Sequence, residues 1–233
     1  MEEAVKAIKL VKKFGEVKAL DGLNLSVPQG IFYGLLGPNG SGKTTTIRIL
    51  SGQIKPTSGK AYVLGIDVSN YIKVREKLGL VPEEEYPPSF LTPLEYLQFV
   101  CKVRKIEDIE EKIKFWLDFL DFENYKNILV KDLSRGTKQK LMLAQAFIHE
   151  PKVVFLDEPF INIDPIIQRR FKKFIRNYVK QGNTILFCTH ILPLAKEVCD
   201  KVGIMKNGRV IKEVKAKNCE KEFFKVFKDV GTA

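Results

Sequence analysis

With 233 residues, of which 45% are hydrophobic, the chain can form one large domain or two small ones around a substantial core. Its 39 Lys and Arg against 28 Asp and Glu give a formal net charge of +11, but no basic block is interleaved with aromatic residues. We therefore interpret the charge as a solvated surface rather than a polyanion site. The four cysteines form no C-x-x-C pair and no secretory signal is recognisable, which favours reduced thiols in a cytosol. No apolar stretch approaches the ~20 residues that span a bilayer, so we expect any membrane part to belong to another chain.

The N-terminal segments predict two kinds of strand. Residues 5–11 and 23–27 alternate apolar and polar side chains, as half-buried antiparallel strands do. Residues 31–36 (IFYGLL) form a nearly unbroken apolar run, which is typical of a strand buried on both faces of a parallel sheet. A short helix over residues 44–50 and another strand over 60–64 follow. We therefore expect a small antiparallel layer beside a central parallel strand.

A phosphate-binding loop is predicted between the strand at 31–36 and the helix at 44–50. Residues 37–44 (GPNGSGKT) fit the pattern G-x-x-x-x-G-K-[ST]. Its glycines allow successive backbone N–H groups to surround phosphate oxygens, and the helix N-terminus favours the same negative charge. We expect Lys43 to reach the β- and γ-phosphates and the Thr44 hydroxyl to ligate Mg²⁺. The alternative, a glycine turn beside a lysine, leaves the flanking strand and helix unexplained, so we predict nucleoside triphosphate binding.

The middle of the chain is predicted to form a helical lobe. Residues 78–82 are typical of a short buried strand. Thr92 and Glu95 then have the spacing of a capping box, with Pro93 at the first helical position. Further on, apolar residues recur at helical spacing: Ile109, Ile113, Trp116, Leu117 and Leu120. We expect residues 92–149 to be all-helical, with the Trp and the phenylalanines in their core.

The last third predicts two more buried strands, at residues 152–156 and 184–188. Between them, Asp164 and Pro165 begin a helix that Gly182 ends.

A hairpin follows over residues 202–205 and 210–214, because Asn-Gly at 207–208 is the signal of a type I′ turn. The tail is predicted to be a helix that packs on the body of the protein through one aromatic face: Phe223, Phe224 and Phe227.

Three titratable residues lie just after the ends of two predicted parallel strands. Asp157 and Glu158 come after the strand at 152–156, and His190 comes after the strand at 184–188. Parallel strands place their carboxyl ends at one edge of the sheet. We expect Asp157 to ligate Mg²⁺ there and Glu158 to polarise an attacking water. Taken alone, the two carboxylates could be plain surface residues and His190 a structural one.

A second anion site is predicted at residues 133–140 (LSRGTKQK), where Ser134 caps a helix. A capped helix start is the simplest interpretation, but it does not explain Gly136 inside the first turn. The functional interpretation is that Ser134 donates to an anion and that Gly136 allows its close approach.

Together these motifs resemble the nucleotide-binding domain of an ATP-binding cassette (ABC) transporter, over nearly the whole chain. Residues 37–45 resemble the family's Walker A motif, and residues 152–158 resemble Walker B with its catalytic glutamate. Residues 133–137 stand where the family has its LSGGQ signature, and residues 162–164 resemble its D-loop.

Single residues extend the resemblance. His190 is similar to the family's switch histidine, and Phe14 matches the aromatic residue that stacks on adenine. The resemblance implies catalytic roles for Lys43, Glu158 and His190, and a metal site of Thr44, Glu83 and Asp157. The implied nucleotide contacts are Phe14, Gly37, Pro38, Asn39, Gly40, Ser41, Gly42, Lys43, Thr44, Thr45, Glu83, Ser134 and Gly136.

The implied fold is α/β: a P-loop NTPase (RecA-like) parallel-sheet core with an N-terminal antiparallel β layer and an inserted helical subdomain. We expect a single ABC ATPase domain over residues 1–233. Its parts would be the β layer with the P-loop core, the helical subdomain with the signature, the Walker B and switch core, and a helical tail: 1–87, 88–150, 151–217 and 218–233.

The implied function is Mg²⁺-dependent ATP hydrolysis that energises translocation, with export as the expected direction, through separate transmembrane permease subunits. Two cassettes, as a homodimer or a mixed pair, would close head to tail around ATP. The protein would then lie in the cytoplasm, peripherally on the cytoplasmic face of the cell membrane. Nucleic acid is not an expected partner.

The sequence departs from the family pattern at three places. The signature has Arg135 and Thr137 in place of its second Gly and its Gln, the glutamine expected after residues 81–82 is Glu83, and Ile161 replaces the serine before the D-loop. One alternative is a soluble ABC-type ATPase acting on nucleic acid or ribosomes, which the net charge keeps open. A nucleotide kinase or GTPase is less favoured, because no N-K-x-D motif is present.

Overall fold

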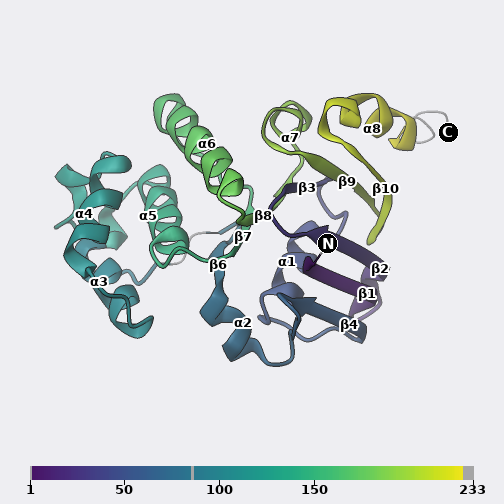
Figure 1. Cartoon of the computed structure of the whole chain (residues 1–233), viewed down its shortest axis with the longest axis horizontal. Helices are drawn as coiled ribbons and strands as arrows, with labels where there is room; N and C mark the ends of the chain where they lie inside the picture. Colours follow the sequence, from purple (N-terminus) through teal and green to yellow (C-terminus); the bar gives the residue numbers. More distant parts are fainter. Residues whose placement is uncertain (1, 85–86, 228–233) are drawn as a thin grey trace.

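The computed structural model describes residues 2–84 and 87–227, which form two β-sheets with helices around them (Figure 1). The smaller sheet has the strand order β2-β1-β4-β5, with the bounds β1 Glu3–Phe14, β2 Val17–Pro28, β4 Ser58–Val63 and β5 Ile66–Asp67. The larger sheet has the order β10-β9-β3-β8-β7-β6, with the bounds β3 Phe32–Leu36, β6 Leu78–Val81, β7 Val153–Asp157, β8 Thr184–Thr189, β9 Lys201–Lys206 and β10 Arg209–Lys215.

The larger sheet is the predicted parallel core. Its pairs β6–β7, β7–β8, β8–β3 and β3–β9 are parallel, and only β10 runs antiparallel, beside β9. Every residue of β3, β7 and β8 is buried, because helices and the smaller sheet cover both faces of these strands. That two-sided burial explains why their sequences are continuous apolar runs rather than alternating ones.

The smaller sheet is the predicted antiparallel layer, but its first two strands are longer than the alternating patterns indicate. β1 and β2 have 12 residues each. Register shifts on both sides of Leu10 interrupt the alternation while keeping Leu10 buried. A β-bulge of this kind moves later side chains to the other face of a strand, so residues 12–22 do not continue the alternating pattern.

The helices and 3₁₀ turns lie around and beside these sheets. Their bounds are α1 Lys43–Leu50, α2 Tyr71–Lys77, α3 Pro93–Val103, α4 Ile109–Phe119, η1 Glu123–Tyr125, η2 Val130–Asp132, α5 Arg135–Phe147, α6 Pro165–Lys180, α7 Leu192–Val198, η3 Ala216–Asn218 and α8 Cys219–Phe227. The sequence patterns did not predict α2 and α7. Each has seven residues, too few for a helical period to stand out from chance.

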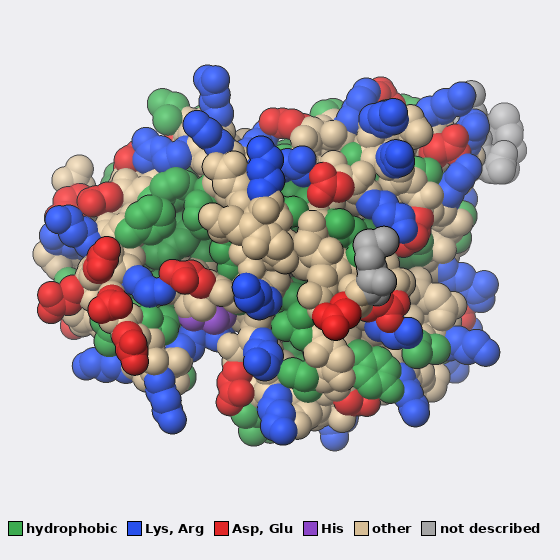
Figure 2. Space-filling model, in the orientation of Figure 1, with side chains coloured by type: hydrophobic (Ala, Val, Ile, Leu, Met, Phe, Trp, Pro, Cys, Tyr) green, Lys and Arg blue, Asp and Glu red, His purple; other side chains and the backbone are tan. Residues whose placement is uncertain are grey.

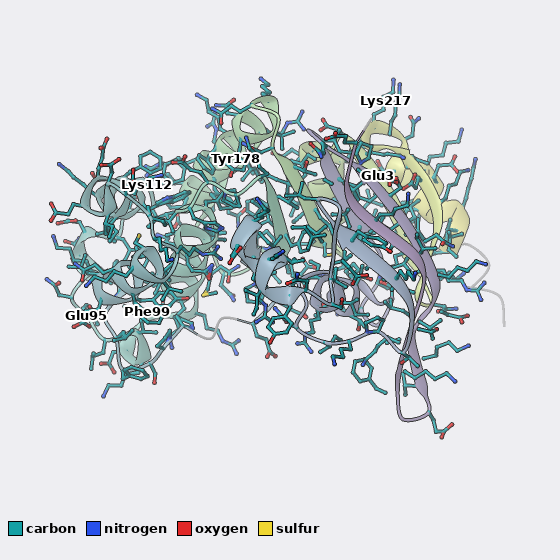
Figure 3. All side chains as sticks on the ribbon, turned by 60° about the horizontal axis from the view of Figure 1, so that its bottom comes forward. Glu3, Glu95, Phe99, Lys112, Tyr178 and Lys217 are labelled. Atoms are coloured by element: carbon teal, nitrogen blue, oxygen red, sulfur yellow. The ribbon has the colours of Figure 1, made fainter. Side chains whose placement is uncertain are left out.

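The predicted helical lobe consists of α3, α4 and α5, which lie together to one side of the sheets (Figure 1). The capping box forms as expected, since the Thr92 side chain accepts from the Glu95 N–H and the Glu95 carboxylate accepts from the Thr92 N–H. Trp116 is buried. Its ring joins an aromatic cluster that also contains Phe147 and, on α6, Phe174 and Tyr178. Tyr178 is labelled in Figure 3. Aromatic burial therefore ties α4 and α5 to α6.

Hydrogen bonds tie the lobe to the start of β6. The Arg104 guanidinium, at the end of α3, donates to the carbonyl oxygens of Arg75 and Leu78, and the Nε2 atom of His149 lies 3.2 Å from the Leu78 oxygen. Burial lowers the pKa of His149 to about 3, with Arg104 and Lys112 acting in the same direction. The His149 side chain, near the end of α5, therefore helps to join the lobe to the core.

The C-terminal region confirms the hairpin and corrects one detail of the tail. Asn207 and Gly208 both have positive φ, 49° and 72°, as a type I′ turn requires. On α8, the rings of Phe223 and Phe227 lie 4.6 Å apart and are partly buried. Phe224 is 53% exposed, so the prediction that all three phenylalanines pack on the body is wrong for Phe224. No helix in residues 2–84 or 87–227 is long and apolar enough to span a membrane.

Candidate nucleotide-binding site

The predicted phosphate loop connects the buried strand β3 to helix α1. Gly42 has φ +106°, a value that favours glycine, and a Cβ atom there would lie 2.7 Å from the Ala19 oxygen on β2. A Cβ atom at Gly37 would lie 2.4 Å from the Met205 oxygen on β9. Glycine is therefore required at Gly42 by the backbone conformation and by the close approach of β2, and at Gly37 by the close approach of β9.

The polar side chains of the loop point to an anion. The Ser41 hydroxyl is buried, with no hydrogen-bond partner in the described part of the chain. The Lys43 ammonium donates to the Gly37 oxygen at 2.8 Å and to the Pro38 oxygen at 3.1 Å, and Lys43 is buried. A buried hydroxyl without a partner is costly unless a ligand completes it, so this loop suits phosphate oxygens. Pro38, Asn39 and Gly40 form the exposed tip, and Thr45 is partly buried on α1.

The three predicted metal ligands meet beside the loop. The Thr44 hydroxyl donates to a Glu83 carboxylate oxygen at 3.1 Å. Asp157, at the end of β7, is 1% exposed, and its Oδ1 atom has no partner among the described residues. The pKa of Asp157 is raised to about 7, mainly by burial and also by the carboxylates of Glu83 and Glu158, although the nearby Thr44 hydroxyl and the Lys43 ammonium act in the opposite direction.

These oxygen ligands fit a magnesium ion that is shared with a nucleotide. A cation at Asp157 would satisfy the partnerless Oδ1 atom and offset the repulsion between the carboxylates. Residues 2–84 and 87–227 contain no group of three or more His, Cys, Asp or Glu that could hold a metal by themselves. Mg²⁺ is commonly bound by one or two carboxylates together with water and phosphate oxygens, which agrees with a hydroxyl and two carboxylates beside a phosphate loop.

Glu158 and His190 are in direct contact at the same edge of the sheet. The Glu158 Oε1 atom lies 2.6 Å from His190 Nδ1 and accepts the His190 N–H at 2.8 Å, and Oε2 accepts from the Thr189 hydroxyl at 3.0 Å. Glu158 is 7% exposed, with φ +48°. An ionised carboxylate only accepts hydrogen bonds, so the imidazole proton lies on Nδ1 and Nε2 is left for another partner. The sequence did not indicate Thr189 as a functional residue, because it looks like any other strand residue.

At the predicted second anion site, the Ser134 hydroxyl is already hydrogen-bonded within the same chain. The Ser134 hydroxyl accepts from the Thr137 N–H at 3.2 Å and lies 2.8 Å from the Thr137 hydroxyl. A Cβ atom at Gly136 would lie 2.2 Å from the Asn162 oxygen, so the glycine is required by the D-loop of the same chain. None of these contacts, within the described residues, reaches the phosphate loop. The sequence also missed Gln139, whose buried side chain donates to the Pro159 oxygen at 3.1 Å and so joins α5 to the Walker B segment.

Phe14 lies at the end of β1, in the sheet whose strand β2 packs against the phosphate loop. Its ring is 49% exposed, and the Lys12 ammonium lies 5.0 Å from the ring centroid. Lys12 also donates to the Lys55 oxygen at 2.8 Å, which holds its ammonium in place. An exposed ring on the sheet that contacts the loop is suitably placed to stack on a base.

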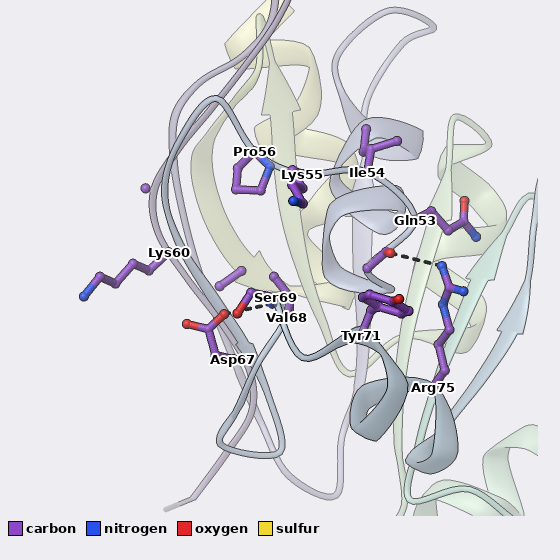
Figure 4. A pocket seen from close by; sticks show the side chains of 13 residues that line it. Gln53, Ile54, Lys55, Pro56, Lys60, Asp67, Val68, Ser69, Tyr71 and Arg75 are labelled. Atoms are coloured by element: carbon purple, nitrogen blue, oxygen red, sulfur yellow. Dashed lines mark hydrogen bonds between the residues drawn. The ribbon is translucent and has the colours of Figure 1, made fainter.

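Two hollows lie near α1. One of about 390 Å³ is lined by Thr44, Glu83 and Asp157, among others, and adjoins the predicted metal ligands. A larger hollow of about 630 Å³ lies beyond the C-terminal end of α1 (Figure 4). It is lined by residues 52–56, which follow α1, and by residues of β4 and α2, where Arg75 stacks on Tyr71. The larger hollow contains none of the predicted site residues, so its size does not bear on nucleotide binding.

A phosphate loop with a magnesium-type oxygen cluster, a carboxylate–histidine contact and a capped signature helix defines an ATPase of the cassette class. Comparison with known families agrees, because residues 20–161 match the ABC transporter family. The chain belongs to this family. Its fold, with the parallel core and the antiparallel layer, is that of an ABC ATPase cassette.

Curated relatives are ATP-binding subunits of ABC transporters. An uncharacterised ABC transporter ATP-binding protein of Methanocaldococcus jannaschii is 35% identical over 99% of this chain and 85% of its own length. The bacitracin transport ATP-binding protein of Bacillus licheniformis is 36% identical over 92% of this chain and 70% of its own. The probable multidrug ABC transporter ATP-binding protein of Escherichia coli is 36% identical over 90% of this chain, which spans 37% of that longer protein.

Solved structures agree with the curated relatives. An ATP-binding subunit of an ABC transporter superposes with a TM-score of 0.89 at 25% identity, covering 98% of this chain and all of the other. A dimeric ATP-binding cassette in a post-hydrolysis state with ADP and Pi has a TM-score of 0.84 at 26% identity, covering 91% of this chain and 98% of the other. The chain is thus an ATP-binding cassette of a transporter family of ATPases, and the alternative of a cassette acting on nucleic acid or ribosomes is not favoured.

Proposed function

We propose that the chain is the Mg²⁺-dependent ATPase subunit of a transporter and that its hydrolysis is coupled to movement in separate permease subunits. One observation carries the catalytic part. Glu158 is held by Thr189 and His190 at the sheet edge where the partnerless Asp157 oxygen also lies. A buried carboxylate fixed beside a metal-type ligand is the arrangement that a general base needs next to a phosphate.

The phosphate loop would bind and orient the nucleotide. Backbone N–H groups of residues 37–45, the Ser41 hydroxyl and the helix end at α1 face negative charge. Lys43 would exchange its contacts with Gly37 and Pro38 for phosphate oxygens. Thr44, Asp157 and Glu83 would hold Mg²⁺, which supplies positive charge to the phosphates when it is bound.

Glu158 would orient the attacking water and accept its proton. His190 would keep that carboxylate in position through its Nδ1 proton and leave Nε2 for the γ-phosphate side of the site. Phe14 would stack on the adenine.

The site would be completed by a second cassette, in a homodimer or a mixed pair. In that pair, Ser134 and Gly136 of one chain would face the γ-phosphate of the other. The dimeric relative with ADP and Pi supports this arrangement. It also accounts for the absence of any contact, within the described residues, between the signature and the phosphate loop of the same chain.

We further propose export as the direction, from the cytoplasmic face of the cell membrane. Relatives whose names specify a cargo include a Nod factor export protein, 35% identical over 90% of this chain, and the bacitracin transport protein. The division into parts at 1–87, 88–150, 151–217 and 218–233 remains part of this proposal. Permease chains that co-purify with this chain from detergent-solubilised membranes would support its assignment as a transporter subunit. Their consistent absence would contradict that assignment.

The variant Glu158→Gln tests the catalytic assignment. It should bind ATP as the wild type does but hydrolyse it at least ~10²-fold more slowly, the range for a positioned general base. It should also form an ATP-dependent dimer in gel filtration. The exposed Glu110→Gln variant is the matched control and should keep its activity. Near-native turnover in Glu158→Gln would overturn the assignment of the base, and a monomer at saturating Mg-ATP would overturn the paired cassette.

His190→Ala tests the positioning role separately. It should retain ATP binding and lose turnover, because the Glu158 side chain loses its Nδ1 contact. An unchanged rate would leave His190 as a structural residue.

A further inference from the structure

Helix α6 is the most basic element in the described part of the chain. Its 16 residues include six that are basic and none that is acidic: Arg169, Arg170, Lys172, Lys173, Arg176 and Lys180. Side chains of Lys and Arg stand out in Figure 2 around the position at which Figure 1 places α6. The positive charge of the protein is therefore partly concentrated on one helix.

A groove of about 680 Å³ runs between α6 and α7, lined by Arg169, Lys173 and Lys180 from one side and by Glu197 from the other. The acidic lining residue Glu197 is already neutralised, because it pairs with Lys172 at 2.7 Å, and the lining residue Arg176 pairs with Asp200 at 2.8 Å.

Three cations in this groove remain without a partner. Arg169, Lys173 and Lys180 are exposed, and no ion pair or hydrogen bond of their side chains occurs within residues 2–84 and 87–227. They lie at positions i, i+4 and i+11, which fall on one face of an α-helix. Like charges on one face repel each other, so the arrangement is unfavourable for the chain alone and favours an anionic partner.

We propose that the α6–α7 groove binds an acidic peptide segment of a partner protein. Arg169 and Lys173 are ~6 Å apart along the helix axis, and Lys180 is ~10 Å further on. In an extended peptide, alternate side chains are ~6.6 Å apart, so carboxylates on every second residue match the first two cations and reach the third within about six residues. Charge complementarity of this type gives specificity and a fast encounter.

The lining of the groove argues against other polyanions. It contains no aromatic residue on which a nucleic acid base could stack. A bilayer surface is flat, whereas these cations lie along a groove between two helices. A peptide backbone instead meets further polar groups there, since Asn177 is exposed beside the cations.

The test compares two triple variants of equal net charge in the full chain. The groove variant carries Arg169→Gln, Lys173→Gln and Lys180→Gln. The control variant carries Lys102→Gln, Lys114→Gln and Lys217→Gln, three exposed lysines on other elements. The probe is a fluorescein-labelled 12-residue peptide of alternating Glu and Ser, measured by anisotropy at 50 mM NaCl and at 300 mM NaCl.

The wild type should bind the peptide at low salt and more weakly at high salt. The groove variant should bind at least ~fivefold more weakly than the control variant, as three exposed ion pairs allow. ATP hydrolysis and the melting temperature should stay unchanged in both. The single reversal Lys173→Glu should weaken binding more than Lys114→Glu, which provides a second test if the triple variant does not fold.

Equal losses in the groove and control variants would overturn the proposal, because binding would then follow net charge alone. Tighter binding of a 12-residue oligodeoxythymidine, lost in the groove variant, would replace the peptide by nucleic acid. Tighter binding of phosphatidylglycerol vesicles, lost in the same variant, would replace it by a membrane surface.

Discussion

The phosphate-loop edge and the signature helix differ in how far the chain satisfies their own polar groups. At the phosphate loop, the Ser41 hydroxyl and the Asp157 Oδ1 atom are buried with no partner among the described residues. At the signature, the Ser134 hydroxyl is already bonded to Thr137, and Gly136 packs against the Asn162 oxygen. The first region is prepared for a ligand within one chain. The second is a finished helix cap, which in the proposed pair of cassettes would act on the nucleotide of the other chain.

The difference has a physical reason. A buried polar atom without a partner costs free energy, so it persists where a ligand regularly completes it. An exposed helix N-terminus is hydrated at little cost and needs no such completion. We therefore expect substitutions at the loop to act on nucleotide chemistry and substitutions at the signature to act first on local packing.

Of these substitutions, Lys43→Ala should have the largest effect on ATP hydrolysis. A small effect would contradict the proposed difference between the phosphate loop and the signature helix. Removing the ammonium nearest to the transferred phosphoryl group should reduce ATP hydrolysis at least ~10²-fold. Steady-state phosphate release measures it, with the exposed Lys60→Ala as the control. Near-native turnover in Lys43→Ala would show that residues 37–45 are not the phosphate site.

Phe14→Ala should weaken nucleotide binding by about 1–3 kcal/mol, the range for base–aromatic stacking. Stacking depends on the face of the base, so GTP should compete appreciably with ATP. The exposed Val17→Ala on β2 is a control close in the chain. Equilibrium titration with a fluorescent ATP analogue would check both points, and strict ATP selectivity or an unchanged affinity would require another adenine contact.

Gly136→Ala should affect the signature through packing. The added methyl group would lie 2.2 Å from the Asn162 oxygen, and overpacking of this kind costs about 1–3 kcal/mol, offset by up to ~1 kcal/mol of better helix propensity. We expect a net loss of about 1–2 kcal/mol in the free energy of unfolding, measured in urea without nucleotide. Arg135→Ala, exposed in the same turn, should change it little; an unaltered stability in Gly136→Ala would mean that the signature and D-loop are not in contact.

Glu83→Gln should have the smallest effect of these substitutions, and it tests how far ATP binding depends on Mg²⁺. The Glu83 carboxylate accepts from Thr44 and raises the pKa of Asp157, so it adds negative charge where a γ-phosphate would approach. With Mg²⁺ the charge is compensated, and without it the charge repels the nucleotide. The variant should therefore gain ATP affinity over the wild type in EDTA, by several-fold, and differ little with Mg²⁺; equal metal dependence in both proteins would contradict this role.

Local patterns in the sequence were sufficient for the phosphate loop, the parallel strands, the helical lobe and the residues at the ends of β7 and β8. They work because each depends on neighbours in the chain: a glycine pattern shapes one turn, and two-sided burial makes a whole strand apolar. The family resemblance rested on these same residues, and the fold and family it implied are confirmed. The individual site roles stay predictions.

Only the tertiary structure decided the contacts between distant segments. Thr189 holding Glu158, Gly136 against Asn162, and Arg104 bonded to the start of β6 join residues that are 26 or more positions apart. The groove of α6 arises in the same way, because α7 and three ion pairs with distant acidic residues decide which cations of one helix remain free among the described residues. Such contacts follow from how whole elements pack, and no periodicity within one element encodes the element that will lie beside it.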